Sequence, residues 1–329
     1  MHPFSQKILH WYAENGRDLP WRRTKDPYAV WLSEIILQQT RIAQGTAYWQ
    51  RFMAHFPTVK DLANATEDEV LRLWEGLGYY SRARNLHAAA RQIDSMGAFP
   101  DTLEGIRSLK GVGDYTAAAI GSICFGLPAA VVDGNVYRVL SRHFGIDTPV
   151  GTTAAKKEFT QLAQRLLPEQ EAAAFNQGMM DFGAIQCTPQ NPACISCPLL
   201  DSCHAFRTGR TAVLPVKKPS AQVKERRLCY VYVRFQGETA IRRRGAGDIW
   251  QGLWEPLLIQ EGEPVPEGSR LIREGVRHQL THRTLITDFR LWEPPVRPEL
   301  PEGYVWIKET ELDRYGKPRL FELLLESVS

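Results

Sequence analysis

Four cysteines near residue 200 are the side chains whose type and spacing most clearly indicate chemistry. They read Cys187-x6-Cys194-x2-Cys197-x5-Cys203, so four thiolates within 17 residues can close on one metal centre at little cost in loop entropy. The central pair is common to zinc and iron–sulfur sites, whereas the flanking spacings fit neither a zinc ribbon nor the bacterial ferredoxin run. A disulfide knot is disfavoured, because 329 residues can bury an ample core. The spacing predicts a metal centre and leaves the metal open.

Two acidic residues far upstream have sequence surroundings that indicate burial. Glu34 lies among apolar residues, and the residue four positions on is Gln38 rather than a cation. A solvated helix Glu is the common alternative, but burial without a countercharge would raise its pKa. Asp133 stands between Val-Val and Gly-Asn-Val, a pattern typical of a helix N-cap, and the helix N-terminus together with Asn135 should keep it ionised.

A glycine turn lies between the two acids. Gly111-Val112-Gly113 precedes an apolar helical segment that starts near residue 114. Without Cβ atoms, such a turn lets a phosphate approach the backbone N–H groups at the positive end of the following helix. Alone it would be an ordinary turn between helices. Together with two candidate acids and a metal loop, it favours binding of the DNA phosphate backbone.

The composition is that of an ordinary globular protein, with 43% apolar and 23% charged residues. No apolar run is long enough to span a membrane and no signal peptide opens the chain, so we expect a cytoplasmic protein that associates with the nucleoid when it binds DNA. The net charge is −1 over residues 1–205, +6 over 206–227 and −2 over 228–329. Bulk charge therefore does not by itself indicate nucleic-acid binding.

Periodicity divides the chain into two domains and a linker. Residues 1–205 repeat apolar side chains at helical steps and predict an all-α domain of roughly ten helices, with a helix–turn–helix at about 107–120 and the cysteine loop at 187–203. Residues 206–227 predict a basic linker. Residues 228–329 predict a small α+β domain, with strands at 228–235, 237–244, 283–292 and 302–312 and a final helix at 317–328.

These motifs, in this order, resemble the helix-hairpin-helix DNA glycosylases that carry a [4Fe–4S] cluster. Within that superfamily the chain most resembles the MutY-type adenine DNA glycosylases, whose sequence blocks are matched by residues 31–34, 37–40, 76–80 and 175–177. The likeness covers residues 1–205 closely and the C-terminal domain loosely. It implies a [4Fe–4S] cluster on the four cysteines, and a monomer that acts on double-stranded DNA containing 8-oxoguanine·adenine or guanine·adenine. It leaves the protein partners unknown.

The resemblance also assigns roles. Glu34 would be the general acid that protonates adenine, and Asp133 with Asn135 would stabilise the oxocarbenium ion. Tyr115 stands where bifunctional relatives carry a lysine nucleophile, which implies a monofunctional glycosylase of base excision repair without strong strand-cleaving lyase activity. Tyr115 is expected to hydrogen-bond Asp133 in place of that lysine. The remaining implied residues are the base pocket of Leu19, Trp21, Arg22 and Gln177, the DNA-wedging Gln39 and Tyr79, and the hairpin residues Gly111, Val112 and Gly113.

The C-terminal domain resembles the Nudix-like module with which these enzymes recognise 8-oxoguanine, and it lacks the Nudix hydrolase box. Lesion recognition is expected from His278, Thr281 and His282, with Leu280 where the family carries Phe. Three other readings remain: a related helix-hairpin-helix glycosylase for G·T pairs or, like endonuclease III, for oxidised bases; a non-enzymatic iron–sulfur protein that binds DNA or carries electrons; and a Nudix pyrophosphatase with a helical appendage.

Overall fold

The computed structural model describes residues 1–218, 224–280 and 283–328. The chain forms two compact units, Met1–Lys60 with Ala88–Pro219, and Asp61–His87 with Ser220–Ser329. The first is helical, and the second combines a short helical stretch with the C-terminal sheet. The predicted mainly helical region followed by a small α+β domain is confirmed. Within the described ranges, no helix combines the length and apolarity needed to cross a bilayer.

Residues 3–207 form twelve α-helices, slightly more than predicted, because three of them have only four to six residues. The bounds are α1 (Pro3–Asn15), α2 (Pro27–Ile36), α3 (Ile42–His55), α4 (Val59–Asn64), α5 (Glu67–Leu73), α6 (Ser81–Met96), α7 (Leu103–Ser108), α8 (Asp114–Phe125), α9 (Gly134–Phe144), α10 (Thr153–Leu166), α11 (Ala172–Asp181) and α12 (His204–Arg207).

The helices that carry the candidate acids begin and end at residues suited to caps. Asp26 caps α2 by accepting from the backbone N–H of Tyr28, and Pro27 occupies the first helical position. α8 and α9 both end at glycines in the left-handed conformation, Gly126 and Gly145. These signals fix where α2 begins and where α8 and α9 end, and so help to place Glu34, Tyr115 and Asp133 along their helices.

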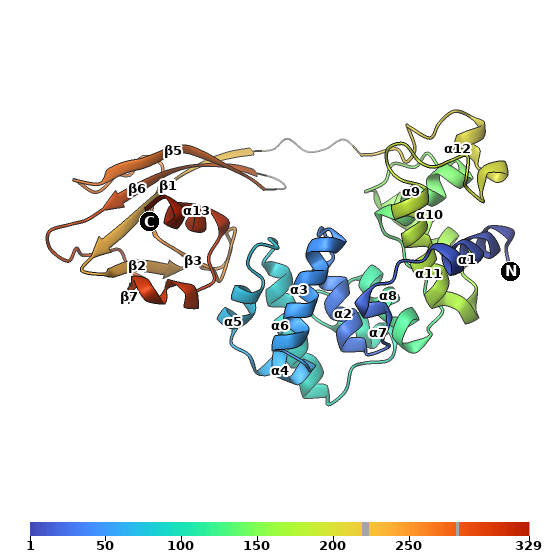
Figure 1. Ribbon diagram of the computed structural model, residues 1–329, viewed down its shortest axis with the longest axis horizontal. Coiled ribbons are helices and arrows are strands. Elements are labelled where there is room, and N and C mark those ends of the chain that lie inside the picture. The colour runs from blue at the N-terminus through green and yellow to red at the C-terminus, as the bar shows by residue number, and fades with distance from the viewer. Residues whose placement is uncertain (219–223, 281–282, 329) are drawn as a thin grey trace. The chain divides into compact units, whose positions relative to one another are not determined.

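Packing within the first unit brings these helices together. α2 lies between α3 and α8, and α1 packs along α11 (Figure 1). A buried cluster joins α1, α9, α10 and α11 through large side chains such as Trp11, Phe159 and Phe175. The elements that bear the two acids and the predicted base pocket therefore share one packed body.

The C-terminal part of the second unit is a mixed sheet with one helix against it (Figure 1). Its described strands are β1 (Lys224–Phe235), β2 (Glu238–Arg243), β3 (Trp254–Glu255), β4 (Leu257–Ile259), β5 (Arg270–Gln279), β6 (Arg283–Trp292) and β7 (Tyr304–Lys308), and the helix is α13 (Arg319–Val328). β1 pairs in parallel with β6, and the other pairings of these strands are antiparallel. Leu320, Phe321 and Leu324 of α13 enter the core beneath the sheet.

Strands β3, β4 and β5 were not predicted. β3 and β4 have two and three residues, too few for a periodic signal. β5 lies at the edge of the sheet, where among the described strands it pairs only with β6, and Val276 is its one buried residue. A polar, charged edge strand lacks the alternation by which strands are found, although charges of this kind protect an edge from unwanted pairing.

The ends of the predicted linker belong to ordered structure. The Val150 N–H donates to the Val216 carbonyl at 2.8 Å, and Arg142 Nε donates to the Leu214 carbonyl at 3.0 Å. At the other end, β1 already begins at Lys224. Residues 206–218 therefore lie against the helical unit, and the domain limits at 205 and 228 stay a prediction.

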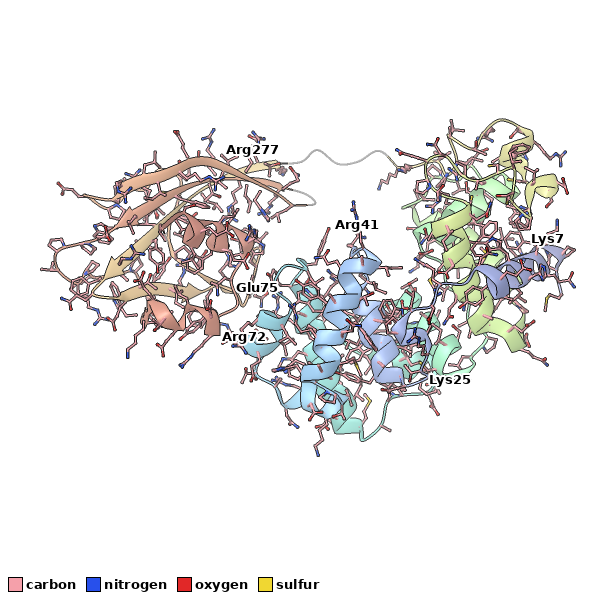
Figure 2. The ribbon with its side chains drawn as sticks, viewed as in Figure 1. Lys7, Lys25, Arg41, Arg72, Glu75 and Arg277 are labelled. Carbon is pink, nitrogen blue, oxygen red and sulfur yellow. The ribbon has the colours of Figure 1, made fainter. Side chains whose placement is uncertain are left out.

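The second unit holds residues 61–87 through polar contacts to the C-terminal part. The backbone N–H of Lys317 donates to the carboxylate of Glu75 at 2.7 Å, and Arg243 pairs with Glu67 at 2.9 Å. Figure 2 labels Glu75 and the neighbouring Arg72. Burial raises the pKa of Glu75, and the Lys317 N–H opposes that rise.

We expect Asn176→Ala to destabilise the first unit. The buried Asn176 accepts from the Val131 N–H at 3.0 Å and donates to Ser122 Oγ and to the Ala129 carbonyl, so it holds the segment that leads into Asp133. Its loss would leave buried polar groups unpaired and lower the free energy of unfolding by about 3 kcal/mol. Chemical denaturation would measure this, with Asn15→Ala at the exposed end of α1 as control, expected within about 0.5 kcal/mol of the native protein. Equal effects of the two variants would contradict the role of Asn176.

Candidate active site

Glu34 lies in the last turns of α2 and is only 9% exposed. Its Oε2 accepts a hydrogen bond of 2.9 Å from the hydroxyl of Tyr115. Burial raises the pKa of Glu34 to about 7; the Tyr115 bond opposes the rise, the charge of Asp133 adds to it and Arg22 opposes it. The predicted burial is confirmed, and among the described residues Glu34 forms no ion pair, so its carboxyl group is protonated in part at neutral pH.

Asp133 is the N-cap of α9, as predicted. Its Oδ1 accepts from the Val136 N–H at 2.8 Å, and its Oδ2 accepts from the Asn135 side-chain amide at 2.7 Å. Burial raises the pKa of Asp133, whereas these two bonds and the charge of Arg138 lower it. The cap and the amide stabilise the ionised form, in line with the sequence expectation, but against a larger cost of burial than the sequence indicated.

Tyr115 differs from the sequence expectation in its partner. Its hydroxyl donates to Glu34 rather than to Asp133, and Met180 Sδ lies 3.6 Å away. α8 packs directly on α2, so a side chain in the first turn of α8 reaches the carboxyl carried by α2. The nearby charge of Asp133 still contributes to raising the pKa of Tyr115, after burial and Glu34. The two acids and the phenol therefore form one electrostatic group.

A cavity of about 490 Å³ opens over this group. Glu34, Asp133, Asn135 and Tyr115 all line it, and so do the four predicted base-pocket residues and one of the two predicted DNA wedges: Leu19, Trp21, Arg22, Gln177 and Gln39. Gln39 has a backbone φ of +59°, a left-handed conformation in which non-glycine residues are uncommon. Residues that stand 158 positions apart in sequence, from Leu19 to Gln177, thus meet at a single hollow.

Asp181, which the sequence analysis missed, organises the arginines of this cavity. It is fully buried at the end of α11 and receives two bonds from Arg22, of 2.7 and 2.8 Å. Arg17 donates three more, through the backbone N–H at 2.9 Å, through Nε at 2.8 Å and through a terminal guanidinium nitrogen. Burial raises the pKa of Asp181, but the hydrogen bonds from Arg22 and Arg17 outweigh it and hold the pKa below its usual value. An acidic residue within the apolar sequence Met-Met-Asp-Phe was the available signal.

The hairpin has the predicted form, a turn between α7 and α8. Gly111 takes a φ of +77°, which favours glycine, and Gly113 is the extended N-cap residue of α8. A Cβ built on Gly113 would meet no atom within 4 Å, so the backbone there is open to an approaching group. Val112 is buried and anchors the turn between the two glycines.

The four cysteines are brought together as the spacing predicted. All four are free thiols that line one small cavity of about 30 Å³ with Arg142. Arg142 donates to Cys187 Sγ at 3.4 Å and to the Thr188 carbonyl at 2.7 Å. Among the described residues, no three His, Cys, Asp or Glu side chains are arranged to hold a single metal ion.

A chain of hydrogen bonds connects the cysteine segment with Asp133. Arg138 on α9 donates through Nε to the Cys187 carbonyl at 2.7 Å and through one terminal nitrogen to Asn135 Oδ1 at 2.8 Å. Asn135 in turn donates to Asp133. On the other side, Lys7 of α1, labelled in Figure 2, donates to the Pro198 carbonyl at 2.8 Å. The segment is thus fastened to both α9 and α1.

The remaining predicted residues lie in the second unit. Tyr79 is exposed and has a φ of +47°; it lines a cavity of about 810 Å³ together with His278, Leu280 and Trp250. The rings of Trp250 and His278 lie 5.8 Å apart, and burial lowers the pKa of His278. Of the expected lesion-reading residues, His278 stands in β5, where the neighbouring Gln279 pairs with Thr284 of β6. Thr281 and His282 themselves lie outside the described residues.

Two family models match the chain in order. Residues 32–169 match the HhH-GPD superfamily base excision DNA repair protein, and residues 229–327 match the NUDIX domain. Among solved structures, the helical part is similar to a thermostable thymine-DNA glycosylase, with a TM-score of 0.58 and 33% identity over 62% of this chain and 95% of that one. A covalently trapped endonuclease III–DNA complex, with a TM-score of 0.55 and 23% identity over 62% of this chain and 94% of that one, shares the fold.

Two relatives from other organisms indicate the family within this superfamily. The chain is 36% identical to the adenine DNA glycosylase of Buchnera aphidicola subsp. Acyrthosiphon pisum (strain APS) over 98% of this chain and 97% of that protein. It is 44% identical to the adenine DNA glycosylase of Homo sapiens over 61% of this chain and 39% of that longer protein. Because it matches a relative of that name over almost the whole length of both chains and its helical part matches the base excision repair family model, this chain belongs to the adenine DNA glycosylase family of base excision repair.

Proposed function

We propose that the chain is a monofunctional glycosylase that removes adenine paired with 8-oxoguanine or guanine and leaves an abasic site. The observation that carries this proposal is the cavity in which Glu34, with a pKa of about 7, faces the same hollow as Asp133. Cleavage of a glycosidic bond requires a proton for the leaving base and negative charge near the sugar. Two carboxyl groups in different environments supply both.

Glu34 is the proton donor in this proposal. It must be protonated when the base is bound and must give its proton to a ring nitrogen as the bond to the sugar lengthens. The hydroxyl of Tyr115 donates to Oε2, so Oε1 is the oxygen left to carry the proton toward the base. The phenol also stabilises the carboxylate that forms when the proton leaves, because a hydrogen bond to the charged form favours it.

Asp133 is the electrostatic partner. Its carboxylate is held by the α9 N-terminus and the Asn135 amide, and so is oriented before the reaction begins. A positioned negative charge stabilises an oxocarbenium ion without reorganisation at the moment of bond cleavage. Tyr115 occupies the position at which bifunctional relatives carry a lysine nucleophile, so we infer that strand cleavage does not follow base removal.

DNA binding is assigned to the hairpin and to the two wedging side chains. Open backbone at Gly113 and the first turn of α8 would receive a phosphate. Gln39 and Tyr79 would fill the space left when the adenine leaves the stack, and both are held in uncommon left-handed conformations, which occur at sites under functional constraint. Arg41, whose side chain projects from the start of α3 in Figure 2, is exposed two residues after Gln39.

We further propose that a [4Fe–4S] cluster is held by Cys187, Cys194, Cys197 and Cys203. A tetrahedral zinc ion would draw its thiolates to about 2.3 Å from one point. The four cysteines line one small cavity, so four thiolates are available there, and the choice of a [4Fe–4S] cluster over zinc rests on the family to which the chain belongs. When bound, the cluster would cross-link the segment that Arg138 joins to Asn135 and thus to Asp133.

Lesion recognition is assigned to the cavity of the second unit. His278 and Leu280 line it beside Tyr79, and its volume of about 810 Å³ can accept a base. Thr281 and His282, which follow Leu280 in the sequence, would supply the hydroxyl and ring donors that distinguish 8-oxoguanine. Leu280 replaces an aromatic residue of the family pattern, so we expect a smaller preference for 8-oxoguanine over guanine than an aromatic side chain would give.

Duplex cleavage tests the proposed reaction. In labelled duplexes with 8-oxoguanine·adenine, guanine·adenine or guanine·thymine, we expect the adenine strand to be cut only after alkali, because an abasic site is alkali-labile. Cutting of the thymine strand instead would favour the activity named for the thymine-DNA glycosylase relative. Cutting without alkali would mean a lyase despite Tyr115. Hydrolysis of free nucleoside triphosphates with no base excision would favour a Nudix enzyme.

Glu34→Gln tests the acid. We expect base removal to fall by about 10²- to 10⁴-fold while duplex binding is kept, since Gln retains the shape but cannot donate a labile proton. In the native enzyme, the single-turnover rate should fall as pH rises through about 7, where Glu34 loses its proton. The free energy of unfolding should also fall as pH rises from about 4.5 to about 7, because over this range the unfolded chain releases the Glu34 proton while the folded chain keeps it.

The stability of Glu34→Gln relative to the native protein should therefore increase over that pH range, as measured by denaturation at several pH values. Asp68→Asn, at a half-buried acid in α5 outside the cavity that Glu34 lines, serves as control and should leave the rate profile unchanged. A native rate that does not depend on pH near 7, or full activity in Glu34→Gln, would refute the assignment.

Cys194→Ser tests the cluster. The native protein should be brown, with broad absorbance in the blue and with iron and acid-labile sulfide in equal amounts. Cys194→Ser should lose this colour, because serine is a poor ligand for iron in such clusters. Cys124→Ser, at a lone cysteine in α8, should keep it. A colourless native protein that contains zinc would reverse the metal assignment.

A further inference from the structure

Tyr12 stands immediately behind the base pocket without lining it. It lies in the last turn of α1, and its hydroxyl donates a hydrogen bond of 2.5 Å to Oε1 of Gln177 on α11. Gln177 lines the cavity over Glu34 and Asp133, whereas Tyr12 does not. The contact therefore connects a side chain outside the site with one that a bound base would touch.

Two glycines give the Tyr12 side chain its room. A Cβ on Gly16 would lie 2.7 Å from Tyr12 Cε2, although the φ of −59° at Gly16 is available to any residue. A Cβ on Gly178 would lie 3.0 Å from Tyr12 Cβ and 3.2 Å from Ile8 Cγ2. Gly178 directly follows Gln177, and its missing side chain lets α1 and α11 approach closely. The backbone on both sides is thus shaped around this phenol.

The direction of the hydrogen bond decides what Gln177 offers to a ligand. Burial raises the pKa of Tyr12, with an opposing effect from Arg22, so the phenol keeps its proton and donates it. Arg22 lies 5.9 Å from the ring centre and is itself bonded to Asp181. An amide side chain has one accepting end and one donating end. With Oε1 engaged by Tyr12, the Nε2 end is the one that can face the cavity.

We propose that Tyr12 is a positioning residue that fixes the Gln177 amide with its N–H group toward the base pocket, and so selects a base with an accepting ring nitrogen. Adenine offers three such atoms, N1, N3 and N7. We assign the ring nitrogen that receives the proton from Glu34 to N7, which leaves N1 and N3 for the Gln177 amide. Without the phenol, the amide can turn over and present its oxygen, which repels a ring nitrogen. This inference rests on the proposed adenine excision and names the residue that orients its pocket.

Tyr12→Phe, assayed with purine analogues, tests this role. Single-turnover excision would be measured opposite 8-oxoguanine for adenine, 1-deazaadenine and 3-deazaadenine, by the native protein and the variant. We expect the native rate to fall about tenfold when the contacted nitrogen becomes C–H, as for loss of one good hydrogen bond. Tyr12→Phe should lose about tenfold on adenine and show little further loss with that same analogue. Effects of the analogues on duplex stability cancel, because both proteins meet the same duplex.

Tyr28→Phe is the matched control. The Tyr28 hydroxyl is buried in the same unit and donates to the Phe56 carbonyl at 2.8 Å, so its removal should cost stability and leave the analogue ratios native. The pH dependence should be native in both variants, because neither touches Glu34. If Tyr12→Phe does not fold, Gln177→Ala provides the test. It must then abolish the difference in excision rate between adenine and the analogue that slows the native protein.

The outcomes distinguish the positioning role of Tyr12 from the proposed function. If the native protein removes no adenine, the proposed function fails and this inference with it. If the native protein is active but Tyr12→Phe keeps the native penalties for both analogues, or if Gln177→Ala keeps them, the positioning role is overturned while the proposed function stands. Loss of the penalty for one analogue in Tyr12→Phe alone, with Tyr28→Phe native, supports it.

Discussion

The structure of the site depends on one constraint, which is that a carboxyl group buried without a cation prefers its neutral form. Burial of Glu34 on α2, against which α8 packs, raises its pKa to about 7, although the hydroxyl of Tyr115 and the charge of Arg22 both oppose the rise. A second carboxylate, Asp133, is brought close enough to add to that shift. The helices that enclose Glu34, the cap that fixes Asp133 and the packing between them all serve to maintain this unequal pair.

Asp181 shows by contrast how strongly a charged partner changes the pKa of a buried carboxyl group. It too is fully buried, but Arg22 and Arg17 supply four hydrogen bonds of ordinary length, and its pKa falls below the usual value. It is therefore a permanent anion that orients two guanidinium groups at the cavity, whereas Glu34 can gain and lose a proton near neutrality. Two buried acids a short way apart in the fold thus have opposite roles because only one of them is paired with charge.

Much of the fold and site could be predicted because the signals are local. The helical periodicity of residues 1–205, the cap at Asp133, the glycine turn before α8 and the strand alternation in β1 and β6 each depend on residues close in sequence. The sequence did not predict the strands that are stabilised by pairing with another strand rather than by their own residue pattern. β5 is a polar edge strand that exists because β6 pairs with it, and β3 and β4 are too short to have a period.

The sequence by itself determined which side chains are candidates for the chemistry: an acid in an apolar helix, an aspartate at a helix start, a glycine hairpin and four thiols with cluster-like spacing. These motifs depend on residue type and local spacing, which can be read directly from the sequence. Only the tertiary structure decided which groups meet. It gave Tyr115 to Glu34 rather than to Asp133, placed Asp181 beneath two arginines, and set Tyr12 against Gln177 where α1 packs on α11. Hydrogen-bond partners of this kind lie 81, 159 and 165 residues apart, and only packing brings such distant side chains within 3 Å.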